Sequence, residues 1–144
     1  MTATNAIENI GIEGWLYSVF SGDATLHALI ADRIYADMAP EDATYPCLIF
    51  AAQSPGVDLD TPGFHHVWVN ALYRIEAVGK TASKGSLAPI AERVHALIQA
   101  QRAVTSAVSI EACYRESPFV LSETVDGVRW SRLGGIYRIF AQPV

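Results

Sequence analysis

The sequence predicts an α+β fold. We expect a mainly antiparallel sheet of about four to five strands, with one long amphipathic helix over about residues 86–101 packed on it and a short N-terminal pair of helices. Three observations support this prediction. Residues 67–77 alternate between apolar and polar side chains, residues 87–98 place apolar side chains at helical spacing, and Asp126-Gly127 stands between two alternating segments. The 144 residues are expected to form a single domain over 1–144.

The first third of the chain predicts two short helices joined by a tight corner. Apolar residues recur at helical spacing over residues 12–20, although two glycines weaken the start of this helix. Ser21-Gly22-Asp23 then ends the helix and supplies a new N-cap, after which a second short apolar stripe follows. Residues 33–35 predict a brief extended segment, and residues 40–45 an acidic loop.

The middle of the chain predicts a buried strand, a loop and an unusually long strand. Cys47–Ala51 is a continuous apolar run, which is typical of a central strand covered on both faces. Turn-forming residues from Gln53 to His66 predict the longest loop of the chain. As a strand, residues 67–77 would extend about 36 Å, so we expect part of this strand to project beyond the body.

Alternation assigns the two faces of this long strand. One set of side chains is expected to face the core: Val67, Val69, Ala71, Tyr73, Ile75 and Ala77. The other set is expected to form an exposed face: Trp68, Asn70, Leu72, Arg74 and Glu76. Trp68 suggests a contact with another subunit, because Trp is enriched at the centres of protein interfaces, whereas Trp15 is expected in the core.

The last third of the chain predicts the long helix, a half-buried strand and a hairpin. Ser86 is the expected N-cap of the helix, and Pro89 is tolerated in its first turn. The next strand alternates, with one face made of Val108, Ile110, Ala112 and Tyr114. Asp126-Gly127 is a preferred two-residue hairpin turn, since both positions need positive φ.

The turn sets the register of the hairpin. It pairs Glu123 with Trp130, Leu121 with Arg132 and Phe119 with Gly134. A solvent-exposed face is expected from Ser122, Thr124, Arg129 and Ser131. A bulge is expected at Gly134-Gly135, where the strand pattern is interrupted.

Composition favours contact with partners over chemistry. Hydrophobic residues make up 51% of the chain and charged residues 17%, so part of the apolar surface is expected to be covered by partners, first of all by further copies. The net charge of -5 argues against nucleic-acid binding, because neutralising phosphates needs a basic face. With no run of roughly 20 apolar residues and no secretion signal, we expect synthesis in the cytoplasm without a membrane span. Cys47 and Cys113 are expected to be buried thiols.

Catalytic and metal-binding motifs are absent from the sequence. It has no nucleophile elbow, phosphate-binding glycine loop, zinc-helix motif or Cys-x-x-Cys pair. His65 and His66 follow Asp58 and Asp60, but neighbouring strand residues point to opposite faces and cannot share one ion, so a solvated loop is favoured. We therefore expect no catalytic, cofactor-binding or metal-binding residues, no cofactor, and no enzymatic activity.

The order of these segments carries a family resemblance. The segments that carry it are the helical pair ending at residues 29–35, the run Tyr45–Phe50, the long strand at 68–77, the helix around residues 90–94 and the C-terminal strand pair. In this order they resemble the tail-completion or tail-terminator proteins of long-tailed phages, prophages and phage-derived transfer particles.

The resemblance implies a structural virion protein of the tail or neck, assembled in the host cytoplasm. It implies a homohexameric ring that caps the head-proximal end of the tail tube, ends tube growth and forms the head–tail joining surface. The implied partners are other copies of the chain, the tail tube protein, and a head–tail connector or stopper protein. DNA would pass through the ring without specific binding, and neither membrane nor cofactor would take part.

Two contact surfaces are expected on this basis. The subunit interface would use Trp68, Asn70, Arg74 and Glu76, and the tail-tube contact loop would use Asp58, Leu59, Asp60 and Phe64. Two alternatives remain open. One is another neck component, a connector or stopper, and the other is a small-ligand protein or enzyme with a pocket lined by Tyr73, Tyr114 and Trp130.

Overall fold

A computed structural model describes residues 8–60 and 66–143, with the side chains of all these residues except 55–60 and 66–68. Within the described residues the helical elements are α1 (Glu8–Ser21), α2 (Ala24–Ile30), the 3₁₀ turn η2 (Lys84–Leu87) and α3 (Ala88–Ile98). The strands are β1 (Ile34–Ala36), β2 (Cys47–Asp60), β3 (His66–Gly79), β4 (Ala103–Val104), β5 (Val108–Val125) and β6 (Val128–Pro143). They form one sheet in the order β1-β2-β3-β6-β5-β4, antiparallel except where β1 joins β2. The fold is α+β, as the sequence predicts.

The strand count and the helix lengths differ from the prediction. The described sheet has six strands rather than four to five, because short β1 and β4 are added at its two edges. The longest described helix is α1, with 14 residues, and α3 has 11. The predicted helix over 86–101 ends early because Gln99, at ψ 126°, is extended. Ala100, at φ 61°, then turns the chain so that its N–H donates to the Cys113 carbonyl at 2.7 Å. Ser86 lies in the 3₁₀ turn, and Leu87 takes the N-cap position instead.

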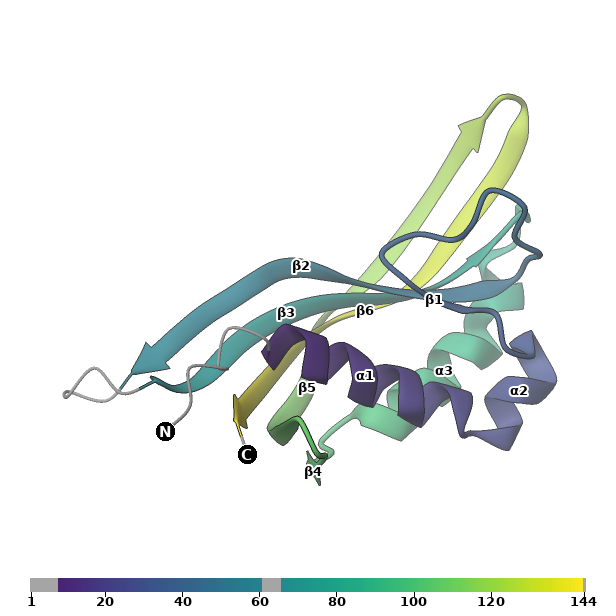
Figure 1. Cartoon of the computed structure of the whole chain (residues 1–144). Helices are drawn as coiled ribbons and strands as arrows, with labels where there is room; N and C mark the ends of the chain where they lie inside the picture. The colour runs from purple at the N-terminus through teal and green to yellow at the C-terminus, as the bar shows by residue number, and fades with distance from the viewer. Residues whose placement is uncertain (1–7, 61–65, 144) are drawn as a thin grey trace.

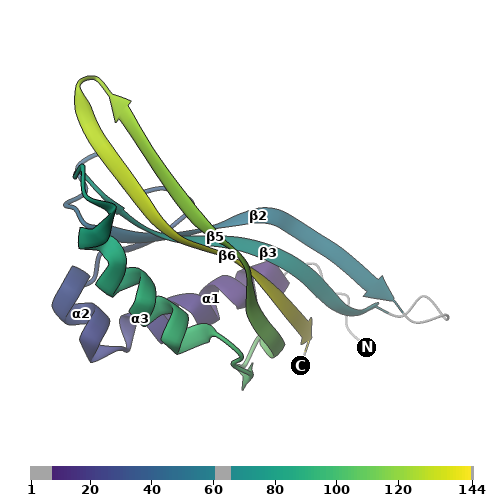
Figure 2. The ribbon, with the colours of Figure 1, turned by 180° about the vertical axis from the view of Figure 1, so that it is seen from behind.

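The three described helices cover one side of the sheet, as Figures 1 and 2 show from opposite directions. The predicted inward residues of β3 from Val69 to Ala77 are buried there, among them Tyr73 and Ile75, and the side chain of Val67 is outside the described residues. Trp15 of α1 is 6% exposed and joins the same core, as expected. Burial of these apolar side chains supplies most of the driving force for the fold. The opposite side of the sheet carries no helix in the described part of the chain.

An ion pair fastens the corner between α1 and α2 to α3. Asp23 is the predicted N-cap of α2, and its carboxylate accepts the Leu26 N–H at 2.9 Å. The same carboxylate accepts two bonds from Arg93 of α3, at 2.9 and 2.6 Å. The bond from Arg93 is the largest cause that lowers the Asp23 pKa from 3.8 to about 2.

Two edges of the sheet run out into projecting arms (Figure 1). Pairing of β2 with β3 continues to Asp60 opposite His66, so the predicted loop over 53–66 is wrong for residues 53–60. Register shifts on both sides of Ser54 accommodate Pro55 and Gly56, which is tolerable because this part of β2 lies at the sheet edge. The expectation that the long strand projects is confirmed.

The second arm is the β5–β6 hairpin. Asp126 and Gly127 have φ of 50° and 79°, and the three predicted cross-strand pairs are all present. Ser122, Thr124 and Arg129 are exposed, but Ser131 is buried because its hydroxyl donates to the Thr81 carbonyl at 2.7 Å.

Gly134-Gly135 is not a bulge. Both glycines pair without interruption with β3 and β5. A Cβ at Gly134 would lie 2.0 Å from the Ile75 carbonyl oxygen, so a close approach of strands requires glycine there. The bulges lie on β5 instead, at Glu111 and Glu116. The first one reverses the predicted alternation, so that Cys113 is buried and Tyr114 is exposed.

We predict that Asp23→Ala lowers the free energy of unfolding by about 1 kcal/mol, because it removes both a helix cap and the bond to Arg93. The folded-state pKa of Asp23 lies below its ordinary value of 3.8, so this contribution is present above about pH 4 and is lost as the pH falls towards 2. Urea unfolding at about pH 6 and about pH 2.5 measures both values. Asp42→Ala, which removes an exposed carboxylate, is the control; a difference that does not shrink in acid would contradict the assignment.

Candidate functional site

The candidate site is the open face of the sheet, on the side opposite the three described helices. Strand alternation places polar and apolar side chains of β3 and β6 there, in register with one another: Asn70 and Phe140, Leu72 and Arg138, Arg74 and Ile136, Glu76 and Gly134, Val78 and Arg132. Most of these side chains are half-buried, because each lies between two neighbouring strands. The side chains of this face are therefore held by contacts with their neighbours and are only partly exposed to solvent.

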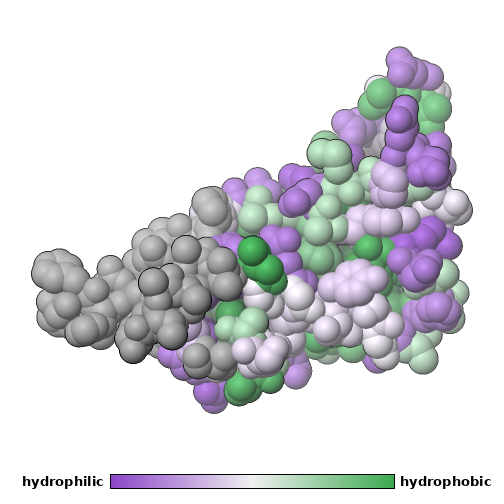
Figure 3. All heavy atoms as spheres, in the orientation of Figure 1, coloured by the Kyte–Doolittle hydropathy of each residue, from purple (hydrophilic) through white to green (hydrophobic). Residues whose placement is uncertain are grey.

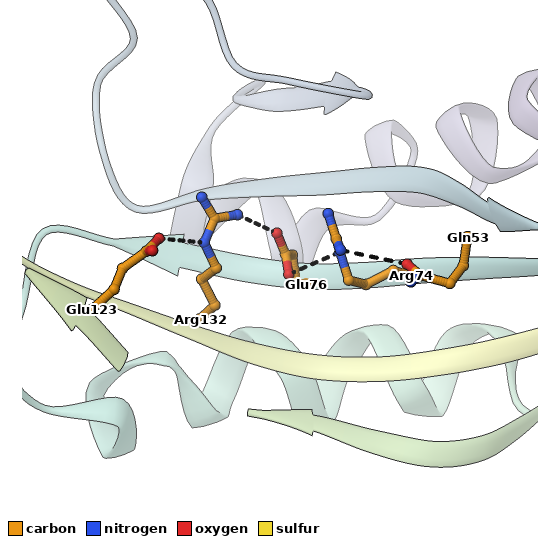
Figure 4. A network of polar contacts seen from close by, with 5 residues as sticks. All are labelled: Gln53, Arg74, Glu76, Glu123 and Arg132. Carbon is orange, nitrogen blue, oxygen red and sulfur yellow. Dashed lines mark hydrogen bonds and ion pairs between the residues drawn. The ribbon is translucent and has the colours of Figure 1, made fainter. Parts of the chain in front are cut away.

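A row of alternating charges crosses this face (Figure 4). Arg132 Nη1 donates to Glu76 Oε1 at 2.5 Å, and Arg132 Nε donates to Glu123 Oε1 at 3.4 Å. On the other side of Glu76, its Oε2 lies 3.3 Å from Nε of Arg74. Arg74 in turn donates to Gln53 Oε1 at 3.4 Å. The row thus joins β5, β6, β3 and β2.

Glu76 is the buried centre of this row. The residue is 1% exposed, whereas the side chains of its partners Arg74 and Arg132 are 29% and 27% exposed. A carboxylate removed from water needs an opposite charge and hydrogen bonds. Arg132 supplies both at Oε1, and Arg74 supplies a second positive charge beside Oε2. The arrangement balances the charges at the centre of the open face.

Aromatic side chains border the charged row at the base of the β5–β6 arm. The guanidinium of Arg74 lies over the ring of Phe119, 5.1 Å from its centroid. Tyr45 and Trp130 meet edge to face at 4.8 Å, and the ammonium of Lys80 lies 5.3 Å from the centroid of each ring. These contacts position the arm against the segment that follows β1. A cleft of about 410 Å³ remains between them.

A second polar cluster lies further along the same face. Arg138 donates to Asn70 Oδ1 at 2.5 Å and also bonds Glu116, the bulged residue of β5. The bond from Arg138 lowers the pKa of the Glu116 carboxyl. Asn70 is therefore already engaged within the subunit, through its side-chain oxygen.

The structure distributes the residues of the predicted subunit interface unevenly. Asn70 and Arg74 are half-buried on the open face, which agrees with the predicted side of the strand. Glu76 lies on that side but is buried, so the expectation that it is exposed is wrong: its charge is used to pair two arginines. Trp68 lies in β3, and its side chain is outside the described residues.

The predicted tail-tube contact loop is corrected in part. Asp58, Leu59 and Asp60 belong to strand β2 and pair with β3, because the hairpin continues past the turn-forming residues. Their side chains are outside the described residues, and so is Phe64. The candidate contact is therefore the end of a β-hairpin arm rather than a loop beginning at Gln53.

The alternative ligand pocket lined by three aromatic residues is not formed. Tyr73 lies on the helix side of the sheet, where its hydroxyl donates to Glu13 Oε2 at 3.0 Å and burial raises its pKa. Trp130 lies on the other side, against Tyr45. Tyr114 is exposed. The sheet therefore separates Tyr73 from Trp130, and this pocket prediction is wrong.

Other features of the described residues bear on the chemistry. Cys47 and Cys113 are free and buried, as predicted, and burial raises their pKa values to about 11 and about 12. Among the residues that the structure describes, no three His, Cys, Asp or Glu side chains gather as a metal site. None of the described helices is long and apolar enough to cross a membrane.

Sequence reasoning missed several members of the site. These are Arg132, Glu123, Phe119, Lys80 and Tyr45. The hairpin register already placed Leu121 opposite Arg132 and Glu123 opposite Trp130. What was missing was the pairing of β3 with β6, which brings Arg132 beside Glu76.

The fold and this surface define a class of protein: a small α+β subunit whose built features are contact surfaces and projecting β-arms. The family model for the tail completion protein gp17 matches residues 15–134. The chain therefore belongs to the tail completion protein gp17 family and is a structural protein of a phage-type tail. The predicted family is confirmed.

A solved structure agrees with this assignment at the level of the fold. A chain in the virion of a native gene transfer agent particle superimposes with a TM-score of 0.67 at 15% sequence identity. The match covers 88% of this chain and 91% of that chain. Comparison with curated proteins finds no match.

We predict that Glu76→Ala lowers the free energy of unfolding by about 3 kcal/mol, because two arginines lose their buried counter-charge. Urea unfolding measures the change. Glu123→Ala is the matched control: it removes the exposed carboxylate at the end of the same row and is expected to change stability by less than about 1 kcal/mol. Equal losses in the two variants would show that Glu76 is not the centre of the row.

Proposed function

We propose that this protein forms a ring that closes the head-proximal end of the tail tube, ends tube growth and forms the surface that joins the head. One observation carries this proposal beyond the family assignment. The open face of the sheet has a charge-balanced centre and continues into two projecting arms, which together offer surfaces for contact. A surface of this kind suits repeated protein contacts rather than turnover of a substrate, so we propose a non-enzymatic role.

The proposed ring is a homohexamer made of one domain per chain, over residues 1–144. Its proposed partners are the tail tube protein on one side and a head–tail connector or stopper protein on the other. It would reside in the tail or neck of the virion after assembly in the host cytoplasm. The net charge of -5 fits a channel through which DNA passes without being held.

A ring joined head to tail needs two different surfaces on each subunit. We assign one of these two subunit surfaces to the open face around Trp68, Asn70 and Arg74, where Glu76 forms an ion pair with Arg74. We assign contact with the tail tube to the end of the β2–β3 arm, around Asp58, Leu59, Asp60 and Phe64. This arm projects from the body of the subunit (Figure 1).

Light scattering of the purified protein across a range of concentrations tests ring formation. We expect a defined oligomer, six times the 15.6 kDa chain mass if it is a hexamer. Capture on purified tail tubes and on purified connectors then separates a tail-capping role from another neck role. A protein that stays monomeric both in solution and on tubes would contradict the proposal.

We predict that Trp68→Asp gives a folded subunit that no longer forms rings, because a carboxylate at the centre of an interface must lose its water without gaining a partner. Circular dichroism checks the fold, and light scattering checks the mass. Val104→Asp, at a residue 77% exposed on β4, is the control and should assemble normally. Normal rings from Trp68→Asp would move the interface away from this strand.

A further inference from the structure

The β5–β6 arm exposes apolar side chains that nothing in the described chain covers. All residues over 120–129 are exposed, and four of them are large and apolar: Val120, Leu121, Val125 and Val128. Figures 1 and 2 show the hairpin standing away from the body as two strands alone. An isolated two-stranded hairpin is marginally stable in water, and a contiguous apolar patch marks a contact site. The apolar side chains of the arm therefore indicate a surface that contacts another protein.

A groove on the body exposes apolar side chains of its own. It runs between α1 and the segment that follows β1, with a volume of about 780 Å³. Ile10 and Tyr17 of α1 are 70% and 47% exposed along it, and Met38 on the facing wall is 76% exposed. The space-filling view in Figure 3 shows apolar residues reaching the surface both on the arm and on the body below it.

Gly14 lies between Ile10 and Tyr17 on the exposed side of α1. A glycine inside a helix weakens it relative to alanine. At Gly11 the reason is internal, since a Cβ there would lie 2.6 Å from a methyl of Val108. At Gly14 a Cβ would meet nothing within 4 Å. The packing of this subunit therefore does not require glycine at position 14, but the close approach of another backbone would.

We propose that this groove binds the β5–β6 arm of a second copy of the chain. The charges support a copy of this chain as the occupant. Both charged residues of the groove, Glu13 and Glu41, are acidic. Arg129 on the arm is exposed, and the structure gives it no partner among the described residues. The other charges near the arm's end are Glu123, which Arg132 already binds, and Asp126 in the turn.

Within one subunit no described residue of the β5–β6 arm lines the groove beside α1, so the proposed contact joins two copies of the chain. The arm's own residues Val125 and Trp130 border a neighbouring cleft that shares Met38 and Ala39 with the groove. Arm and groove are different surfaces, so their contact can repeat head to tail, and the chain of copies closes into a ring when the rotation between neighbours allows it. The inference rests on the proposed ring and names the surfaces by which its subunits interlock.

Substitution at Gly14 separates assembly from stability. Gly14→Ala should raise the melting temperature, because alanine favours the helix, while weakening association, because a methyl group enters the groove. Gly14→Gln should weaken association further, with a rise in the dissociation constant of roughly tenfold or more. Thermal unfolding and light scattering give the two readouts. Leu29→Gln, at an exposed apolar residue on α2, is the control and should leave the mass unchanged.

A charge exchange tests the occupant. Arg129→Glu alone and Glu41→Arg alone should each weaken assembly, and the double variant should recover much of it, because the two residues then meet with their signs reversed. Recovery requires that the arm of one copy reaches the groove of another. A double variant as weak as the two singles combined would overturn the assignment of the arm to this groove.

The outcomes also separate this inference from the proposed function. If Gly14→Gln forms rings as well as the wild-type protein does, the proposed contact between arm and groove is wrong, while the proposed ring is unaffected. Loss of tail-tube capture in Gly14→Gln with rings intact would give the groove to the tube protein and overturn a second copy as its occupant. A wild-type protein that never forms rings, in solution or on tubes, would overturn both proposals.

Discussion

The pairing of β3 with β6 is the contact on which the rest of the structure depends. It runs without a break from Val69 opposite Ala141 to Gly79 opposite Ser131, and both arms extend from it. Gly134 lets the two strands approach more closely than a side chain would allow, since a Cβ there would overlap the Ile75 carbonyl. On one face of this pair lies the helix-covered core, and on the other lies the charged row. One ladder thus positions both the core and the candidate site.

The two faces solve different physical problems. On the helix side, apolar burial and the Asp23–Arg93 ion pair hold three helices against the sheet. On the open side the described part of the chain has no helix to exclude water, and Glu76 is buried by its neighbours on the sheet itself. Its two arginines balance the charge that burial leaves behind. The open face can therefore stay ordered without a covering layer, which leaves it available to another protein.

The arms extend this logic to assembly. The β5–β6 hairpin exposes valines that make few contacts with the rest of its own subunit. On α1, a Cβ at Gly14 would contact nothing in the same subunit within 4 Å. Neither the exposed apolar side chains of the arm nor the exposed glycine is explained by packing within one subunit. A contact between the arm of one subunit and the helix of another would explain both. A family of tail completion proteins gives a setting in which such contacts between copies have a role.

Much of the local structure could be predicted from local patterns. The hairpin register followed from Asp126-Gly127, since this pair favours a two-residue turn with two positive φ angles, whose twist matches that of the flanking strands. Asp23 as a helix cap and the buried face of β3 followed from equally local rules. The turn-forming residues over 53–60 led to the wrong prediction of a loop, because a strand at a sheet edge tolerates Pro55 and Gly56 by bulging.

The sequence by itself determined the fold class, the alternation of β3 and the hairpin turn, because helix, strand and turn preferences act between residues close in the chain. Tertiary structure alone decided that Glu76 is buried, because its burial depends on Arg132, 56 residues away on a strand that only β3–β6 pairing brings alongside. It also decided that the two glycines of β6 relieve a close approach rather than form a bulge. Pairing between distant strands has no local signature, so the site emerged only with the sheet.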